Sequence, residues 1–167
     1  IAMPDFTTVF GSLTNFEKGH IEIIDDDPKN YAFSNVFEVA NNSSPYQKIP
    51  VAKNLENVIE VLRAEGISPW YTNAHDEFAL VLDGEVEVHV YKATNDEHIN
   101  DDLEGSHPFK GEPSGQKIGG CVLKRGHQCI LPNGSVYQFR ARKLGVILQQ
   151  TVKGPLTEEK WKEICLQ

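Results

Sequence analysis

The chain has 167 residues and a formal net charge of −8 at neutral pH. An acidic chain lacks the basic surface that nucleic acid or an anionic membrane requires, so we expect neither as a partner. Apolar residues make up 40% of the chain without an unbroken run long enough to span a bilayer, so we expect one globular domain and no membrane helix.

The cysteines and the start of the chain bear on its compartment. Cys121, Cys129 and Cys165 are odd in number and match no zinc-site spacing. No basic region followed by an apolar stretch opens the sequence, so we expect no secretory signal and a cytoplasmic location with reduced thiols. Cys121 and Cys129 lie among Val, Leu and Ile, which predicts two small buried side chains.

Residues 1–50 are expected to form an N-terminal arm. A charged break, Asp25–Pro28, interrupts apolar residues that suggest short strands: Ile21, Ile23, Val36, Phe37 and Val39. The arm is rich in phenylalanine, which we expect to cover the domain's own sheet, with a partner's surface as the alternative: Phe6, Phe10, Phe16, Phe33 and Phe37.

A helix is predicted next, over residues 52–65. Its apolar residues recur at helical spacing, at Leu55, Val58, Ile59 and Leu62. Gly66 follows at the position where a helix commonly ends.

From Ile67 onward the apolar period changes to two, which predicts strands. Residues 78–82 and 85–91 are separated by Asp83-Gly84, a predicted hairpin turn, and further strands are expected at 120–123, 129–131, 136–141 and 144–151. A polar, acidic insert at 92–118 interrupts this block, which we take as a barrel over residues 51–154. Residues 155–167 are predicted to form a C-terminal helix with Thr157 as its N-cap.

Two spacings in the strand block resemble the motifs of the cupin family. Glu77 followed by Gly84 after six residues resembles the end of the first cupin motif, and Gly126-x5-Pro132-x-Gly134 resembles the second. Both stand in the family's order within a strand-rich chain. The resemblance implies an all-β fold with flanking helices, a cupin double-stranded β-helix or jelly-roll barrel.

The same resemblance identifies the positions of the metal ligands, which in cupins are three His and one Glu. Glu77 is retained, whereas Tyr71, Asn73 and Tyr137 stand where cupins have His. Neutral Tyr and Asn are poor ligands for a divalent transition metal. We therefore expect no metal, cofactor or catalytic residue in this chain, and a degenerate pocket formed by Tyr71, Asn73, His75, Glu77 and Tyr137.

A shifted metal site is the alternative to that expectation. His75 and Glu77 are two apart and share a strand face, so with one further His, such as His127, they would form a His/carboxylate triad suited to non-haem iron. His127 directly follows a turn glycine, which weighs against it. We favour either a hydrogen-bonded His75–Glu77 pair or His75 as a residue of the pocket wall.

Over nearly its whole length the chain resembles the small subunit of the two-component hydroquinone 1,2-dioxygenases of bacterial para-nitrophenol degradation. The resemblance rests on MPDFTTVFGSLTNFEKGHIEI, SPWYTNAHDEFALVLDGEVEVHVYKATNDEHINDD, GGCVLKRGHQCILPNGSVYQFRA and GPLTEEKWKEI. It implies a large cupin subunit that holds Fe(II) and, with O₂, opens the ring of hydroquinone, an aromatic diol, to 4-hydroxymuconic semialdehyde.

In that family two small subunits usually join two large ones. The resemblance therefore implies a supporting, non-metal role for this chain, with the arm and the insert as the candidate interface. Two alternatives stay open: a stand-alone metal cupin oxygenase using His75, Glu77 and His127, and a metal-free cupin that binds a small molecule.

Overall fold

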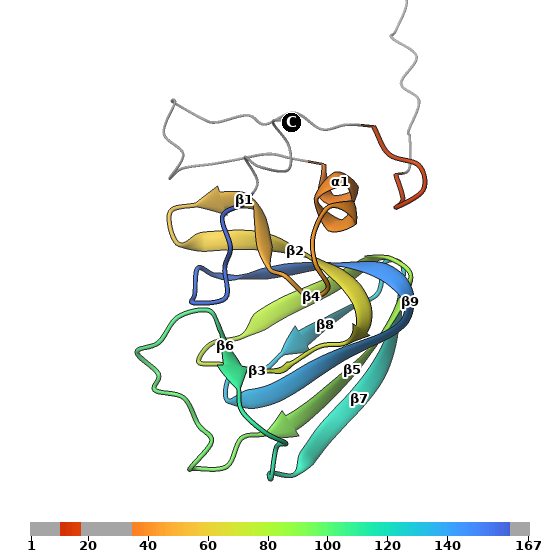
Figure 1. Ribbon diagram of the computed structural model, residues 1–167. Helices are drawn as coiled ribbons and strands as arrows, with labels where there is room; N and C mark the ends of the chain where they lie inside the picture. Colours follow the sequence, from red (N-terminus) through yellow and green to blue (C-terminus); the bar gives the residue numbers. More distant parts are fainter. Residues whose placement is uncertain (1–10, 18–34, 161–167) are drawn as a thin grey trace, which may run out of the picture.

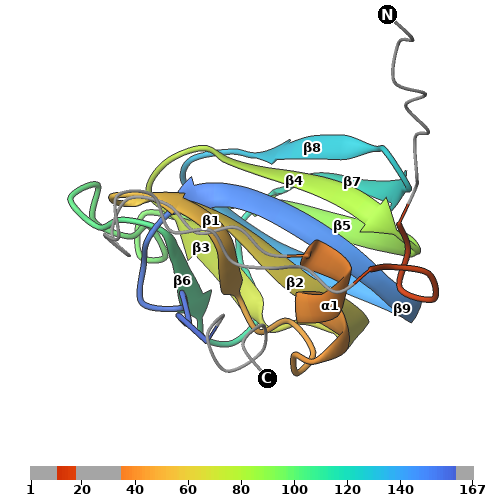
Figure 2. The same cartoon turned by 90° about the horizontal axis from the view of Figure 1, so that it is seen from above.

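The structure, a computed structural model, describes residues 11–17 and 35–160. In this part of the chain one short helix precedes nine strands, all belonging to one sheet that curls around a core (Figures 1 and 2). None of the described helices is long and apolar enough to cross a membrane. The elements are α1 (Val36–Asn41), β1 (Ile49–Asn54), β2 (Asn57–Ile67), β3 (Trp70–Asn73), β4 (Glu77–Asp83), β5 (Glu85–Lys92), β6 (Ser106–Phe109), β7 (Lys117–Lys124), β8 (Gln128–Leu131) and β9 (Ser135–Val152).

The longest strand, β9, is the axis about which the sheet folds. One of its edges pairs with β2 and then β3, and the other edge pairs with β4 and then β5. The sheet therefore forms two walls, which we call the first wall (β1-β2-β9-β4-β8) and the second wall (β6-β3-β9-β5-β7). The cupin barrel predicted from the sequence is confirmed.

The two walls face each other across one hydrophobic core. Leu62, Ala79 and Ile147 come from the first wall and pack in the same cluster as Val88 and Phe139 from the second. Because successive strand residues point to opposite faces, the residues that alternate with these core positions lie on the outside of the walls. Whether a polar strand residue falls on an inward or an outward position of this alternation therefore decides whether it enters the barrel.

The predicted hairpin at Asp83-Gly84 is wrong. β4 and β5 pair with different parts of β9 and not with each other. Gly84 has φ +75°, and a Cβ on it would lie 2.8 Å from the Cα of Gly145. The glycine therefore marks a close-packed corner where the chain passes from the first wall to the second, and not a reversal of direction.

The predicted helix over residues 52–65 is also wrong, because this segment forms β1 and β2. Leu55, with φ 55°, lies in the turn between these two strands. Both faces of β2 are covered: Leu62 points into the core, whereas Val61 packs under α1. A strand buried on both faces loses its alternating pattern, so the apolar residues fell at helical spacing by coincidence.

The secondary structure at the end of the arm and at the end of the chain differs from the prediction: a helix replaces a strand in the arm, and no helix forms at residues 155–160. Val36, Phe37 and Val39, predicted as strand, form α1, which the Asn35 side chain caps by accepting from the N–H groups of Phe37 and Glu38. Phe37 packs on the outer side of the first wall. Residues 155–160 hold a turn and an isolated bridge instead of the predicted helix.

Several predictions about the two ends lie outside the described residues. They are the strands at Ile21 and Ile23, the charged break Asp25–Pro28, the positions of Phe6, Phe10 and Phe33, and the helix beyond residue 160.

The acidic insert at 92–118 is more ordered than its composition predicts. It contains β6, which pairs with β3. The Glu97 carboxylate joins its two ends by accepting from Thr94 N at 3.0 Å and from Ser114 N and Oγ, both at 2.8 Å. These hydrogen bonds lower the pKa of Glu97 to about 2.

Candidate functional site

A buried polar cluster lies inside the barrel at the position where the cupin resemblance implies a metal. At its centre is Glu77, the first residue of β4, which is 1% exposed. It points inward because it lies two and four residues before the core residues Ala79 and Val81 on the same strand. Four side chains donate hydrogen bonds to its carboxylate: Tyr137 Oη (2.5 Å) and Asn73 Nδ2 (3.3 Å) to Oε2, and Ser106 Oγ (2.6 Å) and Thr151 Oγ1 (2.6 Å) to Oε1.

A lysine supplies the positive charge of the cluster. Lys48, 2% exposed, lies just before β1, and its Nζ donates to Gln149 Oε1 at 2.7 Å and to Ser106 Oγ at 3.0 Å. The same nitrogen lies 4.0 Å from Glu60 Oε2 and 4.7 Å from the ring centroid of Tyr71. The ammonium group is therefore surrounded by acceptors and one aromatic face.

The hydrogen bonds run in one direction, from the ammonium to the carboxylate. Lys48 donates to Ser106, and Ser106 donates to Glu77. In parallel, Lys48 donates to Gln149, Gln149 Nε2 donates to Tyr137 Oη at 3.0 Å, and Tyr137 donates to Glu77. Each hydroxyl accepts on the cation side and donates on the anion side, which satisfies both buried charges. We call these five residues the Lys48–Glu77 network.

Burial shifts the pKa values of the groups around this network. Desolvation lowers the pKa of Lys48, while the charges of Glu60 and Glu77 oppose that shift. Desolvation, reinforced by Glu77, raises the pKa of Tyr137 well above its usual value, so Tyr137 remains a neutral phenol that donates its proton. Burial also raises the pKa of Glu60, against the opposing charge of Lys48 and a 2.6 Å hydrogen bond from Thr157.

These residues do not fit a divalent metal. No group of three or more His, Cys, Asp or Glu side chains within residues 11–17 and 35–160 lies close enough to hold one. The oxygens of Glu77 already accept four hydrogen bonds, and the ammonium of Lys48 lies in the same interior. A cation entering here would have to displace these donors and meet an existing positive charge.

The alternative triad of His75, Glu77 and His127 is not brought together. His75 Nε2 accepts from Gly105 N at 3.0 Å, so Nδ1 carries the ring proton and donates to Asp76 O at 2.9 Å. His75 and Glu77 are therefore not the hydrogen-bonded pair that was one expectation, and His75 instead lines the wall of a surface cavity beside Glu77, which was the other. His127 is exposed in the turn between β7 and β8, and its Nδ1 accepts from Lys124 N at 3.2 Å.

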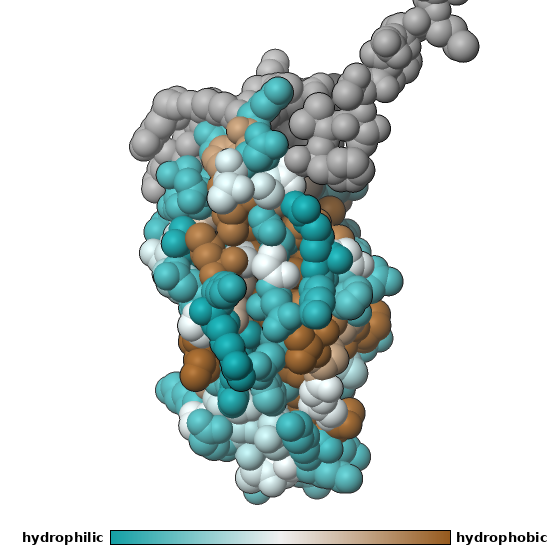
Figure 3. Space-filling model, turned by 90° about the vertical axis from the view of Figure 1, so that its right-hand side faces the viewer, coloured by the Kyte–Doolittle hydropathy of each residue, from teal (hydrophilic) through white to brown (hydrophobic). Residues whose placement is uncertain are grey.

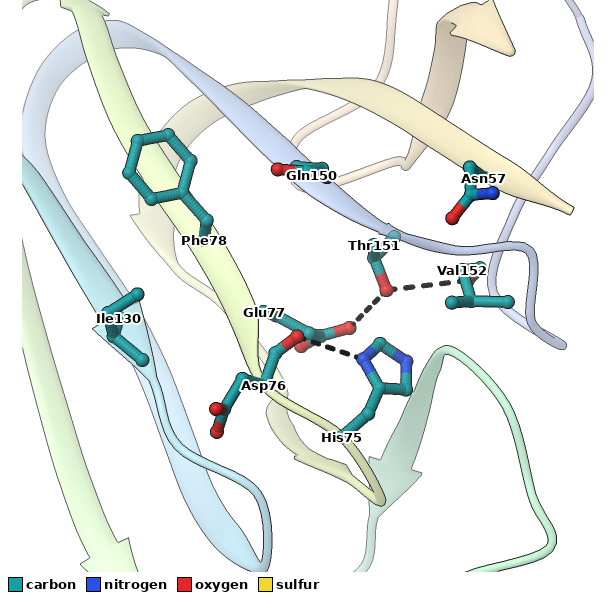
Figure 4. Close-up of a pocket in the computed structure, with 9 residues that line it drawn as sticks. All are labelled: Asn57, His75, Asp76, Glu77, Phe78, Ile130, Gln150, Thr151 and Val152. Atoms are coloured by element: carbon teal, nitrogen blue, oxygen red, sulfur yellow. Dashed lines mark hydrogen bonds between the residues drawn. The ribbon is translucent and has the colours of Figure 1, made fainter. Parts of the chain in front are cut away.

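Two surface cavities reach opposite parts of the network. The first, about 420 Å³, has Glu77 and Thr151 at its inner end and Phe78 and Ile130 along one side (Figure 4). It is lined by Asn57, His75, Asp76, Glu77, Phe78, Ile130, Gln150, Thr151 and Val152. The second, about 290 Å³, borders Lys48 and Tyr71. Neither exposes the network, because Glu77 and Lys48 are both buried.

Of the predicted pocket positions, Asn73, Glu77 and Tyr137 belong to the cluster and Tyr71 covers Lys48. The sequence reading missed Lys48, Glu60, Ser106, Gln149 and Thr151. Gln149 and Thr151 alternate with the core residue Ile147 in β9, so strand parity could have identified them. Ser106 lies in the insert and Glu60 in the segment taken for a helix, where no local signal indicates an inward side chain.

Solved structures that are similar to the chain include two from hydroquinone 1,2-dioxygenases, while no family model and no curated protein matches the chain. A chain of hydroquinone 1,2-dioxygenase PnpCD, in a crystal with Cd²⁺ and 4-hydroxybenzonitrile, is 55% identical with a TM-score of 0.83, over 99% of this chain and 100% of that one. A chain of hydroquinone 1,2-dioxygenase from Sphingomonas sp. TTNP3, with 4-hydroxybenzoate bound, is 50% identical with a TM-score of 0.84, over 96% and 98%.

A second, larger chain has the same fold. In the crystal structure of PnpCD with Fe³⁺, the match covers 83% of this chain but only 38% of the other, at 12% identity and a TM-score of 0.55. PnpCD therefore contains chains of two sizes, and the present chain matches the smaller one along its whole length.

Proposed function

The chain belongs to the family of the smaller chain of hydroquinone 1,2-dioxygenases, and we propose that it acts as the small, non-metal subunit of such an enzyme. The partner is a large cupin chain, and the assembly contains two small and two large subunits in the cytoplasm. The substrate of the assembly is hydroquinone or a related aromatic diol, which it cleaves with O₂ to 4-hydroxymuconic semialdehyde.

The observation that carries this proposal is the Lys48–Glu77 network. It fills the position that the cupin resemblance assigns to the metal, and its acceptors are already occupied by internal donors. In the large subunit, Fe(II) would supply binding of the ring oxygen and activation of O₂. This chain's own residues form a barrel in which the buried Lys48 and Glu77 are linked through Ser106, Gln149 and Tyr137.

The same geometry bears on the two alternatives. A stand-alone metal oxygenase would need His75 and His127 near Glu77, and both imidazoles are bonded elsewhere. A metal-free cupin that bound its ligand through Tyr71, Asn73 and Tyr137 would need these side chains open to the ligand, whereas they are 3%, 0% and 0% exposed. The supporting subunit accounts for both observations.

Reconstitution tests the proposal. The chain is purified alone and together with the large chain of the same organism, identified by its similarity to the larger chain of PnpCD, and ring cleavage is followed with hydroquinone and Fe(II). We expect activity in the complex and at most background in the isolated chain. Ring cleavage by the isolated chain at a rate near that of the complex would refute a supporting role.

A further inference from the structure

Charged side chains are unevenly distributed over the outer faces of the two walls: the β1-β2 part of the first wall carries the ion pair Arg63–Glu65 at 2.7 Å, whereas β4 and β8 carry none. The second wall presents ion pairs to solvent, including Lys124–Glu85 at 3.7 Å and Arg142–Glu87 at 3.7 Å. The outward residues of β4 and β8 in the first wall are Phe78, Leu80, Leu82, Gln128 and Ile130, with no charged side chain. Depletion of charge distinguishes the centre of a protein interface from ordinary surface.

Strand register brings these apolar residues together. Phe78 pairs with Ile130 on one side and with Gln150 on the other, and Gln150 pairs with Ile59. In the next row Leu80 pairs with Leu148 and Gln128. Ile130 is 57% exposed. We call this surface the open face; it consists of Ile59, Phe78, Leu80, Gln128, Ile130, Leu148 and Gln150.

In the neighbouring part of the first wall, the apolar outer side is covered by other elements of the chain. There Val61 and Val146 are fully buried because α1, through Val39 and Ala40, packs over them. Residues 11–17 extend that cover, with Leu13 packed on the cluster and Leu13 N bonded to Asp83 Oδ2 at 2.9 Å. Neither element covers Ile130. On the side of the molecule seen in Figure 3, apolar side chains likewise reach the surface among polar ones.

The 420 Å³ cavity opens at the edge of the open face (Figure 4). Phe78 and Ile130 give it an apolar side, and the exposed Asp76 lies at its rim, oriented by a 2.8 Å hydrogen bond from Asn133 N to its Oδ1. This volume is large enough to receive a large side chain of a partner. The carboxylate at the rim complements a lysine or arginine beside that side chain, as hydrophobic anchors with charged rims do at stable interfaces.

We propose that the open face is the docking surface for the large chain, with the cavity receiving an apolar or aromatic side chain and Asp76 facing a cation of that chain. This inference rests on the proposed function, because the occupant is the second, larger cupin chain found in PnpCD. It moves the interface from the insert and arm, which the sequence favoured, to the outer side of the first wall.

The test compares three variants of the co-produced complex. Ile130→Lys and Gln150→Lys change the open face, while Val122→Lys is the matched control: it is a branched residue 50% exposed on β7, the edge strand of the second wall. Each complex is diluted and its subunit masses are counted by mass photometry. We expect at least a 30-fold rise in the dissociation constant for the first two and less than a 3-fold change for Val122→Lys.

The possible outcomes test the docking surface separately from the proposed function. If Ile130→Lys and Gln150→Lys both dissociate like the wild-type complex, the docking surface is wrong and the proposed function stands. If the variants split the assembly into intact pairs of one small and one large chain, the open face joins two copies of this chain and the inference fails. If the wild-type chains never associate, both fail. Equal weakening by Val122→Lys would also overturn the assignment to the first wall.

Discussion

Lys48 and Glu77 are the two ends of a buried network in which every bridging hydroxyl or amide accepts from the cation side and donates toward the carboxylate. The lysine comes from just before β1 and the glutamate from the start of β4. A cupin barrel normally balances an interior carboxylate with a metal ion. Here Lys48, a side chain of the protein, provides a positive charge that offsets the carboxylate of Glu77.

Removing the cation should destabilise the fold strongly. Lys48→Met leaves Glu60 and Glu77 buried without their common positive neighbour, and we expect a loss of about 3–5 kcal/mol in the free energy of unfolding by urea. Lys48→Met combined with Glu60→Gln should recover part of that loss. The control Lys124→Met removes a surface pair and should cost less than about 1 kcal/mol. A Lys48→Met protein as stable as the wild type would contradict the network.

The short hydrogen bond from Tyr137 to Glu77 should contribute measurably. Tyr137→Phe removes one donor to a buried carboxylate and leaves Gln149 Nε2 with only its longer hydrogen bond to Ser106 Oγ (3.4 Å), so we expect a loss of about 1.5–3 kcal/mol in unfolding free energy. Tyr91→Phe is the control, because its ring packs edge-on against Trp70 and its hydroxyl is no part of the network. Equal effects from both substitutions would argue against a special role for Tyr137.

The Glu97 clamp in the insert should persist to unusually low pH. Its pKa is lowered from 4.5 to about 2, so the ionised clamp stabilises the folded insert above pH 4.5 and is lost as pH falls through about 2. The amide proton of Ser114, which donates to Glu97, should report this transition in an NMR pH titration. The transition should vanish in Glu97→Gln. A Ser114 midpoint near pH 4.5 in the wild-type chain would contradict the clamp.

The two described cysteines should differ in reactivity. Cys121 was predicted to be buried and is exposed, whereas burial raises the pKa of Cys129 to about 12. At pH 8 only about one Cys129 in ten thousand would be a thiolate, the form that reacts with iodoacetamide. Peptide mass spectrometry after brief labelling should find Cys121 modified well before Cys129. Labelling at equal rates would show that Cys129 is reached from solvent.

The sequence predicted the barrel because turn glycines, the proline and strand alternation are local features. It predicted that Asn73, Glu77 and Tyr137 meet because the cupin spacings relate distant strands. It could not predict Lys48, since that residue lies outside every motif and enters the barrel only when β1 pairs with β2. Gly84 shows the same limit: its spacing marks a backbone corner, but only the pairing with β9 distinguishes a corner from a hairpin.

A non-metal role for this chain is tested most directly by the iron content of the assembled enzyme when this chain carries Glu77→Gln. The complex is loaded with Fe(II) without oxygen, separated from free metal, and analysed by mass spectrometry for iron per large chain, with the wild-type complex alongside. We expect equal iron in the two complexes, because the Glu77 carboxylate accepts hydrogen bonds from the residues that bridge it to Lys48 and binds no metal. A loss of half the iron or more in an intact Glu77→Gln complex would contradict it.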